Sequence, residues 1–470
     1  MEAQPVPGAV SAIKNATGKM PLGILSEPRF SCALGAQQTV LAIPKGIPII
    51  HAGPGCSSKA FSFVAGGAGF QGDGYAGGSN VPSSNMTEHD VVFGGEGKLH
   101  SLVEAALEVM KGDLFVILAG CTSGIIGDDV RKVARSFAEA GHPVVGIESS
   151  GFRGNNYFGH ELVLEGIIDQ LLPDTVLQLK PFVVNVFASV PYQDAFWRSD
   201  LEGLKRLLEQ LGLTVNILFG AGSCGIAEWR GLPDAQANIV VSPWVGLSAA
   251  RKLRERFGTP FLHCPVFPVG ARATSEFLRT VADFVGVDTS VLDAVIAHEE
   301  KRYYDYFISL ANFIVDMHNN IPHEAHIVAD SHYGLGLADF LVNDLGFDLK
   351  SLLLVDDPSL AVRKSVEQVA SGLGQGVADA LEFLADGYAA QECLKARIGE
   401  AGSAAIFGST WETDLAKGTN SLLIHVSLPI NDDVIVTRGY FGYDGGLRLM
   451  EDIYAGIFRK GRISYMTLLQ

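Results

Sequence analysis

Three of the six cysteines stand at positions from which a thiol could reach a ligand. Cys56 ends the stretch H-A-G-P-G-C, directly behind an apolar run, and Cys121 follows another apolar run after a single glycine. Cys32 lies in a turn that opens a helical stretch. Thiolates are the usual ligands of iron–sulfur clusters, and N–H groups at helix starts stabilise their charge. The three residues are therefore candidate metal ligands, with ordinary burial as the alternative.

The other three cysteines do not suggest metal binding. Cys264 lies inside an apolar run and Cys393 on an amphipathic stretch, and both are typical of packing. Cys224 belongs to G-A-G-S-C-G, which matches the G-x-G-x-x-G pattern of dinucleotide-binding loops. That fold also requires an acidic residue about 20 positions later, but residues 241–244 read V-S-P-W. We therefore predict no dinucleotide site at this loop.

The elements that position the cysteines are short apolar runs alternating with amphipathic stretches, a pattern typical of parallel α/β sheets. Because the carboxyl ends of parallel strands share one edge of a sheet, we expect Cys56 and Cys121 on the same rim. A glycine beside each of these two residues lets the backbone approach a bulky ligand. In this first part we expect strands at 48–51, 115–119 and 144–148 and helices at 98–111 and 128–140.

The same alternation continues along the chain and predicts three doubly wound, Rossmann-like α/β domains with parallel sheets, at 1–181, 182–321 and 322–470. In the second domain we expect strands at 182–189, 215–219, 239–242 and 261–265, helices at 200–211 and 247–256, and a long helix at 289–319. In the third we expect strands at 326–329, 351–355, 404–407 and 422–426 and helices at 337–345, 360–370 and 379–396.

One segment interrupts this pattern. Residues 64–80 contain seven glycines, which oppose a regular helix or strand because glycine loses the most conformational freedom on folding. We expect an irregular segment here. It is either a flexible surface loop or a loop that closes over a cluster or a partner interface.

Composition excludes several classes of function. The formal net charge of −17 would repel nucleic-acid phosphates, so we predict no nucleic-acid partner. No apolar run reaches the roughly 18–20 residues needed to cross a bilayer, and the first residues do not resemble a secretory leader. The cysteines are too scattered for a disulfide framework. We therefore predict a cytoplasmic protein without membrane contact.

Two longer motifs narrow the function. Residues 85–95 read N-M-T-E-H-D-V-V-F-G-G and residues 121–129 read C-T-S-G-I-I-G-D-D, while the three cysteines are 24 and 65 positions apart. Together these features resemble nitrogenase component 1, the family of the α and β subunits of MoFe protein, and the resemblance extends over almost the whole chain from Cys32. It implies three doubly wound domains and a role in electron transfer.

The resemblance also implies a cofactor and partners. Cys32, Cys56 and Cys121 would bind one half of a P-cluster-type [8Fe–7S] cluster shared with an α-type subunit, in a heterotetramer of two α-type and two β-type subunits. Phe93 would face an ATP-dependent [4Fe–4S] reductase component, with an ordinary core phenylalanine as the alternative. In this interpretation the chain has no catalytic acid or base of its own.

The type of subunit follows from two missing ligands. In the family, the α subunit holds a large iron–sulfur active-site cofactor through one cysteine and one histidine, and the corresponding positions here are Ser242 and Phe441. Residues 439–453 are instead similar to the closing G-Y-x-G segment and helix of the β subunit. The resemblance therefore implies a β-type subunit, with the large cofactor only in the partner.

The chain also departs from common nitrogenase β subunits, which place H-G-x-Q-G-C before the second cysteine and a cluster-contacting serine at the position of Gly151. Here Ala52 and Pro54 alter the first motif, and the glycine-rich segment replaces a more basic and aromatic one. The chain is therefore most similar to the β-type subunit of nitrogenase-like methylthio-alkane reductases, which cleave C–S bonds reductively. The alternatives are a true nitrogenase β subunit that reduces dinitrogen, a cofactor-assembly scaffold, and a dark-operative protochlorophyllide reductase subunit.

Overall fold

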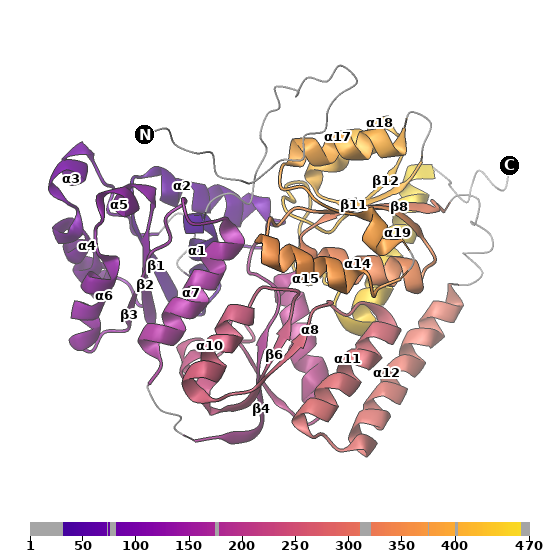
Figure 1. The fold of residues 1–470 in the computed structure, drawn as a ribbon, viewed down its shortest axis with the longest axis horizontal. Helices are drawn as coiled ribbons and strands as arrows, with labels where there is room; N and C mark the ends of the chain where they lie inside the picture. The colour runs from indigo at the N-terminus through magenta and orange to yellow at the C-terminus, as the bar shows by residue number, and fades with distance from the viewer. Residues whose placement is uncertain are drawn as a thin grey trace.

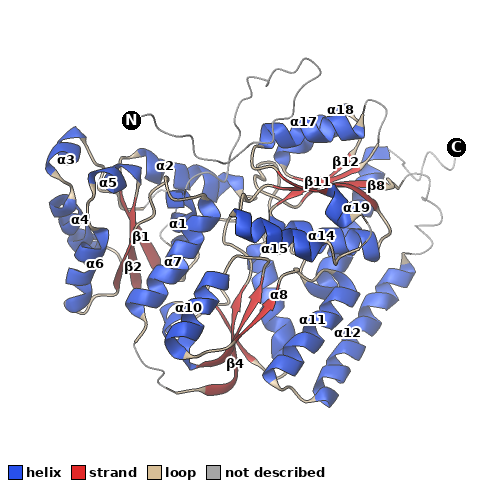
Figure 2. Ribbon diagram, in the orientation of Figure 1, coloured by secondary structure: helices blue, strands red, loops and turns tan. Residues whose placement is uncertain are grey.

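The computed structural model describes residues 32–72, 74–75, 81–173, 178–310, 321–374, 376–399 and 403–461. In this part of the chain, three sheets form in which every strand pair is parallel, and helices flank each sheet (Figures 1 and 2). The predicted α/β class with parallel sheets is confirmed. Within the same residues, no helix is both long and apolar enough to cross a bilayer.

The first sheet carries the predicted cysteine rim. Its order is β1-β2-β3, with β1 at Gly46–His51, β2 at Leu114–Ala119 and β3 at Val144–Ile147. All three strands are buried along their length, which explains their continuous apolar runs. One face packs on α4 (Glu96–Val109) and α6 (Val130–Glu139), and the other packs on α1 (Cys32–Leu41) and α7 (Asn156–Leu171). Because His51 pairs with Ala119, β1 and β2 end side by side.

The second sheet has the order β5-β4-β6-β7. Its strands are β4 (Lys180–Phe187), β5 (Thr214–Ile217), β6 (Ala235–Val241) and β7 (Phe261–Cys264). The helices of this part are α8 (Trp197–Gln210), α9 (Ile226–Gly231), α10 (Leu247–Phe257), α11 (Gly270–Val285) and α12 (Thr289–Ser309). The expected helix at 289–319 corresponds to α12, and residues 311–320 lie outside the described residues.

The third sheet has the order β10-β9-β8-β11-β12. Its strands are β8 (Glu324–Ala329), β9 (Asp348–Leu354), β10 (Leu381–Phe383), β11 (Ala405–Gly408) and β12 (Leu422–His425). The helices are α14 (Ser331–Asn343), α15 (Leu360–Ala370), α16 (Val377–Ala380), α17 (Gly387–Ile398), α18 (Thr413–Gly418) and α19 (Gly442–Gly461). Helix α19 packs against α11 and α12 as well as β12. The domain boundaries near 181 and 322 therefore stay predictions.

Two sequence expectations need correction. The single helix expected at 379–396 is wrong, because Leu381–Phe383 pairs with the edge of β9 and Asp386 caps a new helix through the Tyr388 N–H. Helices α7 and α11 were not expected. Ten of the 16 residues of α7 are buried, so this helix has no polar face that would reveal its periodicity.

The described part of the glycine-rich segment is packed rather than free. A π-helical turn spans Phe63–Gly67, and the Gly69 N–H and the Gly67 carbonyl form hydrogen bonds with the backbone of Ile430. Val64, Ala68 and Gln71 are buried. The interpretation as a flexible surface loop is therefore wrong for this stretch, because the backbone groups that glycine leaves accessible pair with a distant segment. Residues 73 and 76–80 lie outside the described residues.

Candidate functional site

The structure brings Cys56 and Cys121 to the same edge of the first sheet. Cys56 lies in the first turn of α2 (Gly55–Ser62), behind β1, and Cys121 is the first residue of α5 (Cys121–Ile126), behind β2. Both side chains are partly exposed. A Cβ atom built on Gly120 would lie 2.4 Å from the Ala52 Cβ and 3.6 Å from the Cys56 Sγ. The Cys56 thiol therefore lies against the turn that leads into Cys121, and only glycine fits at that turn.

Hydrogen bonds from other elements reach both cysteines. The Gly151 N–H, behind β3, donates to the Cys121 Sγ at 3.2 Å. The bond directs a backbone donor at the sulfur. The Gln37 side chain donates to the Cys56 carbonyl at 3.0 Å and so ties α1 to α2. Gln37 carries no local sequence signal of this role, because its partner is 19 positions away.

The third predicted ligand is only partly placed. Helix α1 begins at Cys32 and packs against α2 and α7, but the Cys32 side chain lies outside the described residues. Among the side chains that the structure describes, no three His, Cys, Asp or Glu converge on a point that could hold a metal ion. The donors that are described, two thiols on a glycine-lined rim and an N–H directed at sulfur, fit an iron–sulfur group.

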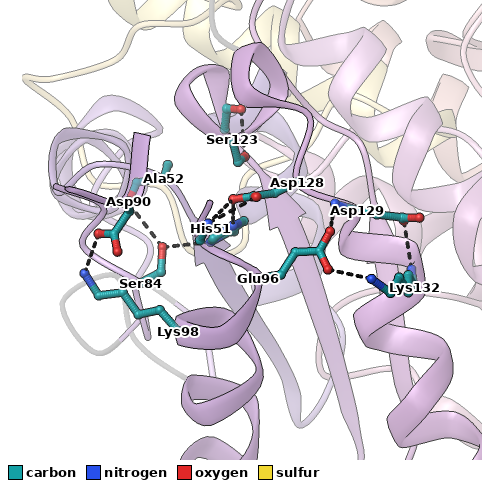
Figure 3. Close-up of polar contacts among 12 residues, drawn as sticks. His51, Ala52, Ser84, Asp90, Glu96, Lys98, Ser123, Asp128, Asp129 and Lys132 are labelled. Atoms are coloured by element: carbon teal, nitrogen blue, oxygen red, sulfur yellow. Dashed lines mark hydrogen bonds and ion pairs between the residues drawn. The ribbon is translucent and has the colours of Figure 1, made fainter. Parts of the chain in front are cut away.

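A buried hydrogen-bond network lies behind the rim (Figure 3). His51, the last residue of β1, is fully buried, and its Nε2 lies 2.8 Å from the Asp128 Oδ2. Its Nδ1 lies 3.0 Å from the Ser84 Oγ, and the Gly95 N–H donates to both Asp128 oxygens at 3.1 and 3.0 Å. Burial lowers the pKa of His51, whereas the bond to Asp128 opposes that shift. We infer a neutral imidazole with its proton on Nε2, because an ionised carboxylate only accepts hydrogen bonds.

A second set of contacts fixes the first motif and the segments that flank the two motifs (Figure 3). Asp90 accepts from the Thr87 N–H at 2.7 Å, and this bond caps the helix α3 (Glu88–Phe93). Asp90 also accepts from the Lys98 ammonium at 2.8 Å. The bond from Lys98 lowers the pKa of Asp90 to about 2. Lys132 likewise donates to Glu96 at 2.8 Å. The sequence showed the two motifs, but it did not show that Gly95 and Asp128 join them.

Phe93 lies at the end of α3 and is 76% exposed, so the alternative of a core phenylalanine is wrong. Val92, beside it, is 72% exposed, and Ile125 in the contacting helix α5 is 70% exposed. We call Val92, Phe93 and Ile125 the α3–α5 apolar patch. Large contiguous apolar patches mark surfaces that bind a partner, and the docking role of Phe93 stays a prediction.

Ser242 lies in a packed interior, whereas Phe441 is buried at the edge of a pocket of about 460 Å³. Ser242 follows β6 and is fully buried, and its Oγ accepts from the Val245 N–H at 3.2 Å. Side chains that include Tyr157, Trp244 and His332 fill the space beside it and leave no room for a water molecule. The Phe441 ring packs against Phe267 and Phe277.

A buried carboxyl group holds the segment that carries Phe441. Asp200 accepts from the N–H groups of Tyr440 and Phe441 at 2.9 and 3.0 Å, and the Tyr333 hydroxyl also contacts it. Burial raises the pKa of Asp200 to about 8, and the two N–H bonds oppose the shift. Neither Ser242 nor Phe441 offers a metal-binding atom of the kind that cysteine or histidine would supply.

Comparisons with known proteins agree on one family. The family described as nitrogenase component 1 type oxidoreductase matches residues 31–458. The chain is 31% identical over 230 residues to the nitrogenase iron-molybdenum cofactor biosynthesis protein NifE of Sinorhizobium fredii. The matched stretch covers 46% of this chain and 44% of that protein. It is 32% identical over 208 residues to the nitrogenase molybdenum-iron protein alpha chain of Azospirillum brasilense. Here the matched stretch covers 43% of this chain and 42% of the alpha chain.

These curated relatives match only in part, and the chain spans about half of their length. A solved structure of nitrogenase Cp1 at pH 6.5 matches more completely, with a TM-score of 0.78 over 95% of this chain and 96% of that chain. At 18% sequence identity, this likeness shows a common fold.

Proposed function

Because the chain belongs to the nitrogenase component 1 family of oxidoreductases, we propose that it is the β-type electron-transfer subunit of a nitrogenase-like reductase. The observation that carries this proposal is the rim on which Cys56 and Cys121 share the edge formed by β1 and β2. With Cys32 at the start of α1, these residues would hold half of a P-cluster-type [8Fe–7S] cluster. An α-type subunit would supply the other half.

The residues of the rim have separate tasks in this proposal. The thiolates of Cys56 and Cys121 bind iron, and the Gly151 N–H withdraws charge from the Cys121 sulfur. Hydrogen bonds to sulfur and exposure to solvent set the reduction potential of iron–sulfur clusters. A cluster bound there would take up and release single electrons. Since both thiols are partly exposed, the open side requires cover by the α-type partner.

The β-type assignment is supported by the residues at positions 242 and 441, which are Ser242 and Phe441. Large side chains fill the space beside Ser242, and both ligand types are absent from these two positions. The large iron–sulfur cofactor would then lie only in the partner, in a heterotetramer of two α-type and two β-type subunits. An ATP-dependent [4Fe–4S] reductase would bind at the α3–α5 apolar patch.

For the reaction, we propose reductive C–S bond cleavage of methylthio-alkanes. Two electrons and two protons convert dimethyl sulfide to methanethiol and methane. Support comes from the departures from nitrogenase β subunits, namely Ala52, Pro54, Gly151 and the glycine-rich segment. Ala52 and Gly151 contact the cysteine rim directly, where side-chain changes alter a redox site without changing the fold.

The test is to purify the complex with its α-type partner and its reductase, and to measure iron and products. We expect iron bound in the complex, methanethiol and methane from dimethyl sulfide, and little ammonia from dinitrogen. A complex with Cys56→Ala controls for iron held elsewhere. Brisk ammonia formation without thiol release would make the chain a true nitrogenase subunit, and an iron-free wild-type complex would contradict the electron-transfer role.

The similarity to NifE favours a second candidate, a scaffold that assembles a cofactor. A scaffold would transfer its cofactor to an acceptor protein without turning over a substrate. The two candidates separate when the loaded complex is mixed with a cofactor-free acceptor. Activation of the acceptor, together with no turnover by the complex itself, would favour the scaffold.

A further inference from the structure

Helix α3 carries Phe93. The segment that leads into its amino-terminal end is attached to the end of β1. Residues 82–86 run beside β1 and pair with it through three backbone hydrogen bonds. These bonds join the Ile50 N–H to the Pro82 carbonyl at 2.8 Å, the Ser84 N–H to the Ile50 carbonyl at 2.9 Å, and the Met86 N–H to the Ala52 carbonyl at 3.0 Å. The start of α3 is therefore fixed to the strand that precedes Cys56.

The other end of α3 is fixed at Asp128. After Phe93 the chain turns through Gly94 to Gly95, whose N–H donates to both oxygens of the Asp128 carboxylate. A Cβ atom on Gly95 would lie 2.7 Å from the Asp128 Oδ2 and 2.9 Å from the His51 Cε1, so the three residues are in close contact. The side chains of His51 and Asp128 are 0% and 6% exposed. Water therefore does not compete for these bonds.

The same two residues connect to both cysteine turns. The His51 carbonyl accepts from the Gly120 N–H at 3.0 Å, directly before Cys121. The Asp128 N–H donates to the Ser123 carbonyl at 3.2 Å, and the Ser123 Oγ donates to the Gly120 carbonyl at 3.1 Å. His51 also ends the strand that leads into the Cys56 turn. A displacement of the Gly95 turn must move Asp128 and His51 or break buried hydrogen bonds.

We propose that His51 and Asp128 are positioning residues that transmit binding at the α3–α5 apolar patch to the turns that carry Cys56 and Cys121. Buried, fully paired hydrogen bonds resist deformation because an unpaired buried donor or acceptor is costly. The patch and the turns therefore shift together. The inference rests on the proposed function in one respect, since the partner at the patch is the ATP-dependent reductase.

The test compares amide hydrogen exchange of the wild-type complex and of variants, with and without the reductase. In the wild type, we expect the reductase to slow exchange at α3 and also in residues 52–62, which do not belong to the patch. In Asp128→Ala, we expect protection at α3 to remain and protection in residues 52–62 to be lost. The reductase-driven rate should fall by about tenfold, a typical effect for residues that couple two sites. The rate of cluster reduction by dithionite, which does not use the patch, is measured in parallel, and the reductase-driven rate should fall by more than this rate.

Two variants serve as matched controls. Asp129, the neighbouring aspartate, caps α6 through the Lys132 N–H and is exposed, so Asp129→Ala removes a carboxylate without touching His51 or Gly95. It should behave as the wild type. Asp128→Asn should also retain the coupling, because its amide can accept from the Gly95 N–H and donate to His51 once the imidazole proton moves to Nδ1 and bonds to Ser84.

Several results would overturn the inference. They are equal exchange in Asp128→Ala and Asp129→Ala, no effect of the reductase on residues 52–62 in the wild type, or equal coupling losses in Asp128→Asn and Asp128→Ala. If Asp128→Ala does not assemble, Gly95→Ala takes its place. The added methyl group would push the Gly95 turn away from the Asp128 carboxylate without removing a polar group. Failure of the proposed function is distinguishable, since it appears as an iron-free wild-type complex.

Discussion

The cysteine rim and the interior around Ser242 lie in equivalent places, just beyond the carboxyl ends of parallel strands, where α/β folds form ligand sites. At the rim, the small residues Ala52, Gly120 and Gly151 lie beside the thiols, and both thiols are partly exposed. Around Ser242, side chains such as Trp244 and His332 leave no space wide enough for a water molecule. The comparison teaches that the fold supplies the position, whereas side-chain size decides whether that position is a ligand edge or a packed junction.

The largest expected effect is at the rim. Cys56→Ala or Cys121→Ala should remove cluster iron and activity together, because each variant would delete a proposed thiolate ligand, and the described side chains nearby offer no third metal-binding group in its place. Iron content per complex and turnover measure the outcome. Cys393→Ala is the control, since Cys393 is buried on α17 in the third part of the chain.

The interior around Ser242 offers the reciprocal control. Ser242→Cys restores a thiol at a filled position and should add no iron, because no space exists beside it for a cluster. Two results would remove the distinction between the two regions. One is equal iron loss in Cys56→Ala, Cys121→Ala and the control Cys393→Ala, and the other is extra iron in Ser242→Cys.

The next effect concerns the surface in front of the rim. Phe93→Ala should lower the reductase-dependent rate while iron content and thermal stability stay unchanged, because the ring is exposed and packs little core. An aromatic side chain central to an interface is worth about 1–3 kcal/mol, which corresponds to roughly 5- to 150-fold in affinity. The control is Tyr306→Ala, another exposed aromatic residue, on α12 at the opposite end of the molecule (Figure 1). A drop in thermal stability with normal reductase coupling would contradict the docking role.

A moderate effect is expected in the packed interior, where burial raises the pKa of Asp200 to about 8. A raised carboxyl pKa means that the folded protein holds a proton that the unfolded chain releases. The stability contributed by Asp200 is therefore complete below the ordinary pKa of 3.8 and is lost as the pH rises through about 8. Asp200→Asn mimics the protonated form. As the pH rises from about 5 to about 9, through the raised pKa of Asp200, wild type should therefore lose thermal stability relative to this variant. Parallel melting curves for both proteins across this range would show that Asp200 is ionised throughout.

The smallest effect separates two glycines near the rim. Gly95→Ala should destabilise the protein by about 1–3 kcal/mol, as expected for overpacking, because its Cβ would collide with Asp128 and His51. Gly97→Ala, in α4, meets no atom within 4 Å and should stabilise by roughly 0.5–1 kcal/mol, because alanine favours helices. Thermal unfolding of both variants tests the pair. Opposite signs are the required result, and equal changes would mean that the contact at Asp128 carries no strain.

The sequence by itself determined the parallel sheets, because apolar runs and amphipathic stretches encode strands and helices among near neighbours. It also placed Cys56 and Cys121 at strand ends, from which a shared rim follows by geometry. Its limits were local as well. Leu381–Phe383 carries no strand signal strong enough to interrupt a helical stretch, and it becomes a strand by pairing with β9.

Only the tertiary structure decided which distant groups meet. The joint of His51, Gly95 and Asp128 joins residues up to 77 positions apart, and none of them has a sequence signature of that contact. The exposure of Phe93, the pairing of the glycine-rich segment with Ile430 and the filled space at Ser242 are likewise properties of packing. Local periodicity is a property of adjacent residues. By contrast, the partners of a buried polar group depend on how whole elements pack, and short stretches of sequence do not encode that packing.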